Sequence, residues 1–212
     1  MIVHKHPQGS DAWHAARAGV ITASMFCTAR ERLKSGANKG DFSAAAKTYA
    51  FRLAIERIGG VPLDEGFETW QMRRGVELEP AARFAHELVL GGLVMPCGFV
   101  TTDDGRFGAS ADGFVGETGG AEYKCLVSPE KLRDVYLTGD ISDYLDQVHG
   151  GMWITGREWW DFCVYCPALE VIGKELFRLR VERDGGYIRA MVDRLEEFAA
   201  FVDQNEAALR AA

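Results

Sequence analysis

The chain lacks any long hydrophobic run, although 47% of its 212 residues are hydrophobic. A helix that spans a bilayer needs about 20 consecutive apolar residues, and residues 1–10 lack the apolar centre of a secretory signal. The sequence also has no internal repeat, low-complexity tract or interdomain linker. We therefore expect a soluble, intracellular protein in which residues 1–212 form one globular domain with a sizeable core and no membrane contact.

Cysteine is scarce, with five residues in the chain, at positions 27, 97, 125, 163 and 166. An odd number at this low density is not typical of a disulfide scaffold, so reduced thiols are expected. Cys163 and Cys166 form a C-x2-C pair, which raises the alternative of an iron–sulfur cluster. Such a cluster needs four thiolates, and a strand would direct these two to opposite faces. We expect no iron–sulfur cluster and interpret both residues as buried strand cysteines.

Positive charge is in the minority, with 24 Lys and Arg against 31 Asp and Glu and a net charge of −7. An acidic chain is a poor match for nucleic-acid phosphates, whose binding needs Lys and Arg. The average hides an asymmetry, because residues 1–60 contain nine basic and four acidic residues, for a charge of +5, which leaves −12 for the remainder. The basic segment could follow a phosphate backbone or could be an ordinary helical surface.

Capping residues and hydrophobic periodicity predict an α+β organisation. Ser10, Thr22 and Ser43 are placed to cap three N-terminal helices, and a loop at 34–40 separates the second from the third. The predicted helices are Asp11–Ala18, Thr22–Leu33, Ser43–Ile58, Phe67–Leu90 with a kink or break near Gly75 and Pro80, Pro129–Leu137, Ile141–Thr155 and Gly185–Leu209. The predicted strands are Leu93–Val100, Arg106–Ser110, Gly113–Val115, Ala121–Leu126, Trp159–Tyr165 and Leu176–Val181, which would form a mostly antiparallel sheet.

Two adjacent glycines interrupt the predicted helix Ile141–Thr155. Gly150 and Gly151 cost helix stability relative to alanine, so they are expected where another group packs closely. That group could be the sheet or a ligand.

The most informative pattern is Asp112 followed, after nine residues, by Glu122-Tyr123-Lys124. If Ala121–Leu126 is a strand, Glu122 and Lys124 lie on one face, and the turn at Asp112-Gly113 can bring Asp112 beside them. Two carboxylates bind Mg²⁺ through oxygen, the bound metal activates water, and an ammonium stabilises charge on a phosphate. The pattern predicts a nuclease that cuts phosphodiesters; the alternative is a solvated hairpin with a surface Glu–Lys pair.

Further motifs surround this core in a fixed order. They are Gln8-Gly9-Ser10-Asp11-Ala12-Trp13, Arg17-Ala18-Gly19-Val20-Ile21-Thr22-Ala23-Ser24, Gly75 with Glu79, Ser110-Ala111-Asp112-Gly113, Glu122-Tyr123-Lys124-Cys125, and Tyr144-Leu145-Asp146-Gln147 with Met152-Trp153-Ile154-Thr155. Over nearly its whole length the chain thereby resembles the phage lambda-type exonucleases, the viral recombinase branch of the PD-(D/E)xK nuclease superfamily. That pattern has Pro before the first Asp, whereas Ala111 stands here. The resemblance implies a restriction-endonuclease-like fold with a central mixed, largely antiparallel sheet flanked by helices.

The resemblance also assigns roles at the cutting centre. It implies that Asp112 and Glu122 bind the metal, with the backbone carbonyl of Tyr123 as a further ligand. Glu79 would complete the site, for a second metal or its water. Lys124 would orient the attacking water or, if its pKa is lowered, accept the proton. Oxygen-only ligation suits Mg²⁺, for which Mn²⁺ could substitute, and disfavours zinc.

A second set of residues resembles the group that holds the 5′-phosphate of the substrate strand. Arg17 can offer a bidentate fork to phosphate oxygens, while Ser24, Ser110 and Gln147 offer neutral donors. Lys34 falls in the loop that in this family lies near the duplex end and helps to part the strands. Without the resemblance these residues would be interpreted as a surface arginine, caps, a helix-face glutamine and a loop lysine.

The function implied by the resemblance is a Mg²⁺-dependent, processive 5′→3′ exonuclease acting on double-stranded DNA ends. It would release 5′-mononucleotides without ATP and leave 3′ overhangs for single-strand annealing. The resemblance further implies a ring-shaped homotrimer, a single-strand annealing protein as partner, and a phage or prophage gene expressed in the bacterial cytoplasm. The alternatives are an endonuclease of the same superfamily and a catalytically degenerate protein that binds DNA ends beside an annealing protein.

Overall fold

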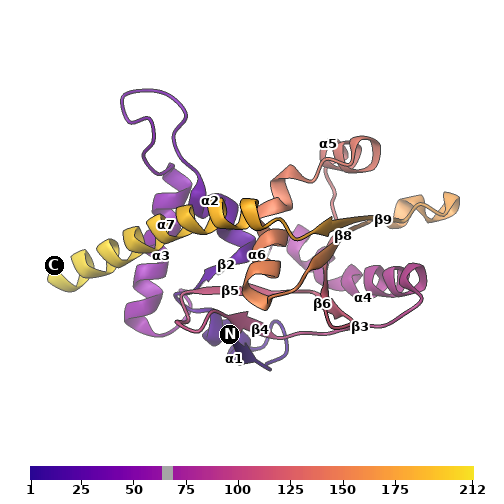
Figure 1. The fold of residues 1–212 in the computed structure, drawn as a ribbon, viewed down its shortest axis with the longest axis horizontal. Helices are drawn as coiled ribbons and strands as arrows, with labels where there is room; N and C mark the ends of the chain where they lie inside the picture. Colours follow the sequence, from indigo (N-terminus) through magenta and orange to yellow (C-terminus); the bar gives the residue numbers. More distant parts are fainter. Residues whose placement is uncertain (64–68) are drawn as a thin grey trace.

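The computed structural model of the protein describes residues 1–63 and 69–212 and shows an α+β fold, as predicted (Figure 1). Within these ranges the strands form two sheets. The first has the order β1-β4-β5-β2, from Ile2–His4 (β1), Phe99–Thr101 (β4), Phe107–Ser110 (β5) and Ile21–Thr22 (β2). The second has the order β3-β6-β7-β8-β9, from Val94–Met95 (β3), Gly113–Val115 (β6), Gly119–Lys124 (β7), Trp159–Tyr165 (β8) and Leu176–Glu182 (β9).

Strand pairing is largely antiparallel, as predicted, with β2–β5 and β7–β8 as the parallel pairs among the described strands. The prediction of a single sheet is wrong because Leu93–Val100 is not one strand. Pro96 has no backbone N–H to donate to a ladder. The chain therefore leaves the second sheet at Met95 and enters the first at Phe99, so this segment joins the two sheets.

The helices follow the capping residues closely. They are α1 (Asp11–Arg17), α2 (Phe26–Arg30), α3 (Ala44–Gly59), α4 (Trp70–Leu90), α5 (Pro129–Arg133), α6 (Leu145–Thr155) and α7 (Gly185–Ala211). The hydroxyls of Ser10 and Ser43 accept the backbone N–H of Trp13 and Ala46, as N-caps do. Gly60 closes α3 in the left-handed conformation.

Some helix boundaries differ from the prediction. Thr22 makes no capping bond and precedes a 3₁₀ turn, η1 (Ala23–Met25). The helix after it ends at Arg30 because Arg32 pairs with Phe42 across the base of the 34–40 loop. Three short helical segments were not predicted as separate elements. A π-helical turn, η2 (Asp134–Thr138), follows α5, and a 3₁₀ turn, η3 (Ser142–Tyr144), precedes α6. A second 3₁₀ segment, η4 (Pro167–Ile172), connects β8 to β9.

Helix α4 continues without interruption through Gly75 and Pro80, so the predicted break is absent. Proline has no backbone N–H, so the carbonyl of Val76, four residues before Pro80, loses its helical hydrogen bond. Both residues are exposed, so water can solvate that carbonyl. The predicted start of this helix at Phe67 lies outside the described residues.

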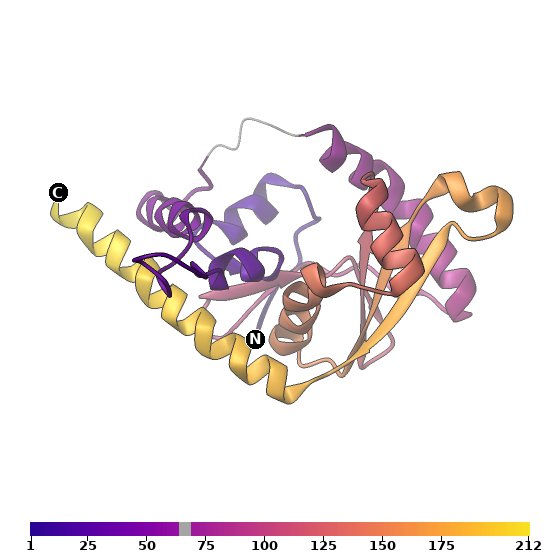
Figure 2. The ribbon, with the colours of Figure 1, turned by 90° about the horizontal axis from the view of Figure 1, so that it is seen from above.

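The five-stranded sheet lies between two helical layers (Figure 2). Helix α4 packs on β7, β8 and β9, and α6 packs on the opposite face. Side chains alternate along β8 accordingly: Trp160 and Phe162 belong to the core beneath α6, whereas Asp161 and Cys163 face α4. A separate core joins the four-stranded sheet to α2, α3 and α7.

Gly150 and Gly151 of α6 confirm the expectation of close packing. A Cβ at Gly150 would lie 2.6 Å from the ring of Phe26, and one at Gly151 would lie 2.8 Å from the ring of Trp160. The two glycines thus let α6 contact both α2 and the five-stranded sheet. Among the described residues, none of the helices combines the length and the apolar character that crossing a membrane requires.

Candidate active site

The turn between β5 and β6 places Asp112 against β7. The backbone N–H of Asp112 donates to the carbonyl of Ala121 at 3.2 Å, and its carboxylate Oδ2 accepts the N–H of Tyr123 at 2.6 Å. The Asp-Gly turn signal therefore predicted the bend correctly, and Asp112 lies beside the strand that carries Glu122 and Lys124.

Glu122 and Lys124 lie on the same face of β7, as their spacing predicted. The ammonium Nζ of Lys124 donates to Glu122 Oε1 at 2.8 Å. Gln147, from α6, bridges the pair: its Nε2 donates to Glu122 Oε1 at 2.5 Å, and its Oε1 accepts from Lys124 at 3.0 Å. Gln147 therefore orients both the Glu122 carboxylate, through Oε1, and the Lys124 ammonium from the α6 side of the sheet.

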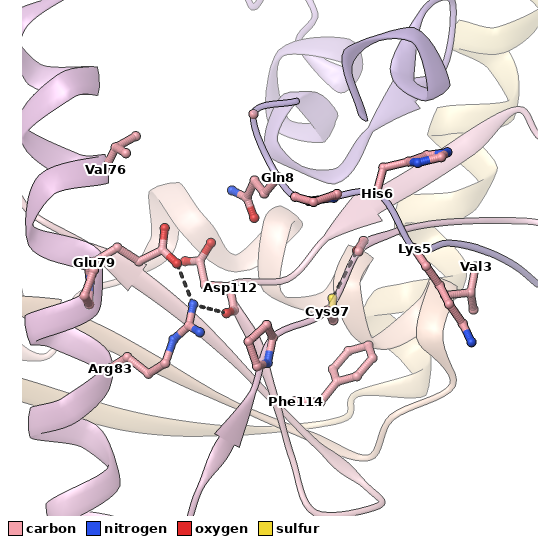
Figure 3. A pocket seen from close by; sticks show the side chains of 15 residues that line it. Val3, Lys5, His6, Gln8, Val76, Glu79, Arg83, Cys97, Asp112 and Phe114 are labelled. Atoms are coloured by element: carbon pink, nitrogen blue, oxygen red, sulfur yellow. Dashed lines mark hydrogen bonds and ion pairs between the residues drawn. The ribbon is translucent and has the colours of Figure 1, made fainter. Parts of the chain in front are cut away.

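Helix α4 brings Glu79 to the site from the other side. Its carboxylate points toward Asp112 (Figure 3). Arg83 Nη2 donates to Glu79 Oε1 at 2.7 Å and to the backbone carbonyl of Asp112 at 3.0 Å. All three residues line a cavity of about 830 Å³. Arg83 was not among the predicted site residues, although its position one helical turn after Glu79 is a signal that could have identified it.

The electrostatics of the site reflect two carboxylates held close together. Burial, followed by the negative charge of Glu122, raises the pKa of Asp112 well above its ordinary value. Burial alone would lower the pKa of Lys124, but the carboxylates of Glu122 and Asp112 outweigh it and the pKa is raised. The ammonium form of Lys124 is thus favoured by its two carboxylate neighbours, and an ammonium can orient water or stabilise phosphate charge.

The donor set fits a hard divalent cation. Asp112, Glu122 and Glu79 offer oxygen ligands only, and a cation would offset the repulsion that raises the pKa of Asp112. Across residues 1–63 and 69–212, no three His, Cys, Asp or Glu side chains gather closely enough to hold a metal by themselves. Mg²⁺ ordinarily completes its coordination with water and substrate phosphate, so two carboxylates are sufficient protein ligands.

Arg17 and Ser110 are in direct contact. Arg17 Nη1 donates to Ser110 Oγ at 3.0 Å, and the indole Nε1 of Trp13 donates to the same oxygen at 3.2 Å. The guanidinium of Arg17 stacks on the Trp13 ring, 4.2 Å from its centroid, and burial lowers the pKa of Arg17. Since Ser110 is two residues from Asp112, this cluster lies close in sequence to the carboxylate of Asp112.

Ser24 lies with Arg17 on a second cavity, of about 710 Å³. Its hydroxyl is 3.4 Å from that of Thr22, the last residue of β2. Gln8 and Val76 line this cavity and also the one that contains Asp112, so the two cavities adjoin. The structure therefore places three of the predicted phosphate-binding residues, Arg17, Ser24 and Ser110, next to the predicted cutting centre.

The other two residues predicted to bind phosphate or DNA, Gln147 and Lys34, are not in the Arg17 cluster. Gln147 contacts Glu122 and Lys124 at the cutting centre rather than Arg17. Lys34 is exposed on the 34–40 loop, which projects from the body of the molecule (Figure 1). A strand-parting role for Lys34 stays a prediction.

Residues 12–158 match the YqaJ-like viral recombinase domain. The chain belongs to this family. Among solved structures, the alkaline exonuclease LHK-Exo from Laribacter hongkongensis is 28% identical, with 95% of this chain and 97% of that chain covered and a TM-score of 0.80. LHK-Exo in complex with dAMP gives the same identity and coverage and a TM-score of 0.82.

A phage-related exonuclease from Haemophilus somnus 129PT shares the fold, with 16% identity, a TM-score of 0.63, and coverage of 91% of this chain and 95% of that chain. No curated protein matches. Membership of the family and the likeness to LHK-Exo confirm the resemblance to lambda-type exonucleases and place the chain in a nuclease family of the exonuclease type.

Proposed function

We propose that this protein is a Mg²⁺-dependent exonuclease that degrades the 5′ strand of double-stranded DNA from its end, releasing 5′-mononucleotides and leaving a 3′ single strand. The observation that carries the proposal is the adjacency of the Asp112–Glu122–Lys124 cluster to the Arg17–Ser110 pair. LHK-Exo, which is similar over 95% of this chain, is an alkaline exonuclease that has been solved with a mononucleotide, dAMP.

Each residue of the cutting centre has a chemical task in this proposal. Asp112 and Glu122 would hold Mg²⁺, which would supply a water of lowered pKa and polarise the phosphate. Lys124 donates to the attacking water or to a phosphate oxygen, where its positive charge stabilises the transition state. Gln147 holds the Glu122 carboxylate in a fixed orientation from α6.

The polarity of digestion would come from the Arg17 cluster. Arg17 can donate a forked pair of hydrogen bonds to a terminal 5′-phosphate. Ser110, which accepts from Arg17 and lies two residues before Asp112, would keep that phosphate at a fixed distance from the cutting centre. After each cut the new 5′-phosphate would occupy the same position, so that digestion continues in one direction and yields mononucleotides.

One assay tests the chemistry. Linear duplex DNA with 5′-phosphate ends is incubated with and without Mg²⁺, and the products are identified. We expect metal-dependent release of 5′-mononucleotides, abolished by Asp112→Ala while binding to DNA ends persists. Covalently closed circular duplex is the control, since an exonuclease leaves it intact. Cutting of the circle would identify an endonuclease, and end binding without nucleotide release would identify a degenerate binding protein.

A second assay tests the polarity. Arg17→Ala should lose the preference for 5′-phosphate over 5′-hydroxyl ends, by about 10-fold or more, the effect of a hydrogen bond to a charged group. Reaction on 5′-hydroxyl ends is the internal control. An equal loss on both substrates would mean that Arg17 supports the structure and does not bind the end.

We also propose the assembly that the family resemblance implies, a ring-shaped homotrimer that passes the single strand through its channel. It would work with a single-strand annealing protein. Both would act in the cytoplasm of a bacterium that hosts a phage or prophage. The proposal rests on membership of the viral recombinase family. A solution mass three times the 23.4 kDa of the chain would support it, and a monomer that digests DNA processively would contradict it.

A further inference from the structure

Helix α4 reaches the candidate active site at two points. At the first, Arg83 donates both to Glu79 and to the backbone carbonyl of Asp112. At the second, His86 faces β7 and has no exposed surface. These three positions are four and three residues apart, so they share one side of the helix. The position of α4 over the sheet thus sets where Glu79 lies relative to Asp112.

His86 takes part in a buried chain of hydrogen bonds. Its Nδ1 lies 2.9 Å from the hydroxyl of Tyr123, on β7, and its Nε2 lies 3.1 Å from Asp161 Oδ2, on β8. A neutral His86 would donate its Nε2–H to Asp161 and accept the hydroxyl hydrogen of Tyr123 at Nδ1. Each side chain would then have a single, defined orientation.

At one end of this hydrogen-bonded network, Asp161 is held by two arginines of β9. Arg180 donates to both oxygens of Asp161, from Nε at 2.9 Å and from Nη2 at 3.0 Å. Arg178 Nε is 3.0 Å from Oδ2. Burial raises the pKa of Asp161, but the bonds from His86 and the two arginines outweigh it, and the pKa is lowered. Asp161 is therefore an anion that can fix His86 firmly.

The other end of this hydrogen-bonded network, Tyr123, is adjacent in sequence to the proposed metal ligand Glu122. Tyr123 stands between Glu122 and Lys124 in β7, and its side chain lies on the opposite face, toward α4. Its backbone N–H donates to the Asp112 carboxylate at 2.6 Å. A shift of Tyr123 would consequently move Asp112 relative to Glu122.

We propose that the buried chain Asp161–His86–Tyr123 is a positioning device that fixes the spacing of Asp112, Glu122 and Glu79 for binding a divalent cation. It does so by tying α4 to β7 and β8 behind the site. The inference rests on the proposed function, since it takes these carboxylates as the metal ligands. Groups behind metal ligands commonly change metal affinity by about 10- to 100-fold when they are removed.

The test compares two tyrosine variants. Tyr123→Phe removes one hydroxyl and leaves the ring in place. Tyr136→Phe is the matched control: its hydroxyl donates to the carbonyls of Val164 and Glu175, both at 3.2 Å, away from α4. Binding of Mn²⁺ to the DNA-free protein is measured by titration calorimetry, and the Mn²⁺ concentration that half-saturates nuclease activity is measured in parallel.

We expect Tyr123→Phe to bind Mn²⁺ about 10-fold more weakly than wild type and the control to bind it normally. Saturating Mn²⁺ should restore activity to Tyr123→Phe but not to Lys124→Ala. Unchanged Mn²⁺ affinity in Tyr123→Phe would overturn the inference. A wild-type protein that neither binds Mn²⁺ nor digests DNA would overturn the proposed function instead. If Tyr123→Phe does not fold, Arg180→Lys, which keeps the positive charge at a partly exposed position but loses the two-point contact with Asp161, is measured in its place with the same two outcomes.

Discussion

At the scale of the residue, Asp161 shows how a buried charge makes stability depend on pH. Its carboxylate has no exposed surface and is bound by His86 and Arg180. Asp161→Asn should lower the free energy of unfolding by about 3–5 kcal/mol at neutral pH, because it leaves the arginines without their anion. The lowered folded-state pKa means that the carboxylate stabilises the protein above its unfolded pKa, near 4, and progressively less below it.

Urea unfolding at about pH 7 and at about pH 3 checks this prediction. The difference between wild type and Asp161→Asn should be largest at neutral pH and should shrink in acid. A difference of equal size at both pH values would show that the variant acts through packing and not through the lost charge.

Residues of the cutting centre could be predicted from the sequence where they are separated by only a few positions or by one turn. Glu122 and Lys124 are two apart in a strand, and Asp112 precedes a turn residue, so their side chains converge for reasons that the sequence displays. The structure places Asp112 against β7 and Glu122 beside Lys124, as the strand spacing and the turn predicted. The roles of Arg83 and His86 depend instead on how α4 lies across the sheet, which is a long-range relationship that no local pattern contains.

At the scale of the element, two helical glycines differ in their surroundings and should respond oppositely to alanine. A Cβ at Gly151 would press on the Trp160 ring, whereas one at Gly75 would meet no heavy atom within 4 Å. Gly151→Ala should destabilise the protein by about 1–3 kcal/mol through overpacking. Gly75→Ala should stabilise it by about 0.5–1 kcal/mol, because alanine loses less backbone entropy in a helix. Thermal unfolding of both variants checks the prediction, and a shift of the same sign in both would contradict it.

Element boundaries could be predicted where the determining group is adjacent in sequence. Ser43 and Gly60 fix the two ends of α3 by capping it, and both signals are local. The end of α2 at Arg30 is set by the pairing of Arg32 with Phe42, ten residues later. Strand β1 was not predicted because three largely exposed residues show no hydrophobic alternation and are held by pairing with β4.

At the scale of the whole molecule, the structure shows where part of the basic N-terminal segment lies. Arg17 and Lys5, both from the basic N-terminal segment, line the two adjoining cavities. A net charge of −7 therefore does not describe the surface that would meet DNA. The cavities lie where the two sheets meet, since Ser110 ends a strand of the first sheet and Asp112 precedes a strand of the second.

This arrangement predicts a salt dependence for binding to DNA ends. Each phosphate neutralised by Lys or Arg releases counterions, so affinity falls with salt. If Lys34 contacts a phosphate near the duplex end, Lys34→Ala should reduce the slope of log affinity against log salt by about 1 without changing the preference for 5′-phosphate.

The matched control is Lys174, an exposed lysine that follows η4 and lies outside the basic N-terminal segment. Binding is measured without Mg²⁺ between about 50 and 200 mM salt, so that digestion does not interfere. Equal slopes for Lys34→Ala, Lys174→Ala and wild type would mean that the projecting loop does not contact the DNA backbone, and that the phosphate contacts come from the cavity residues alone.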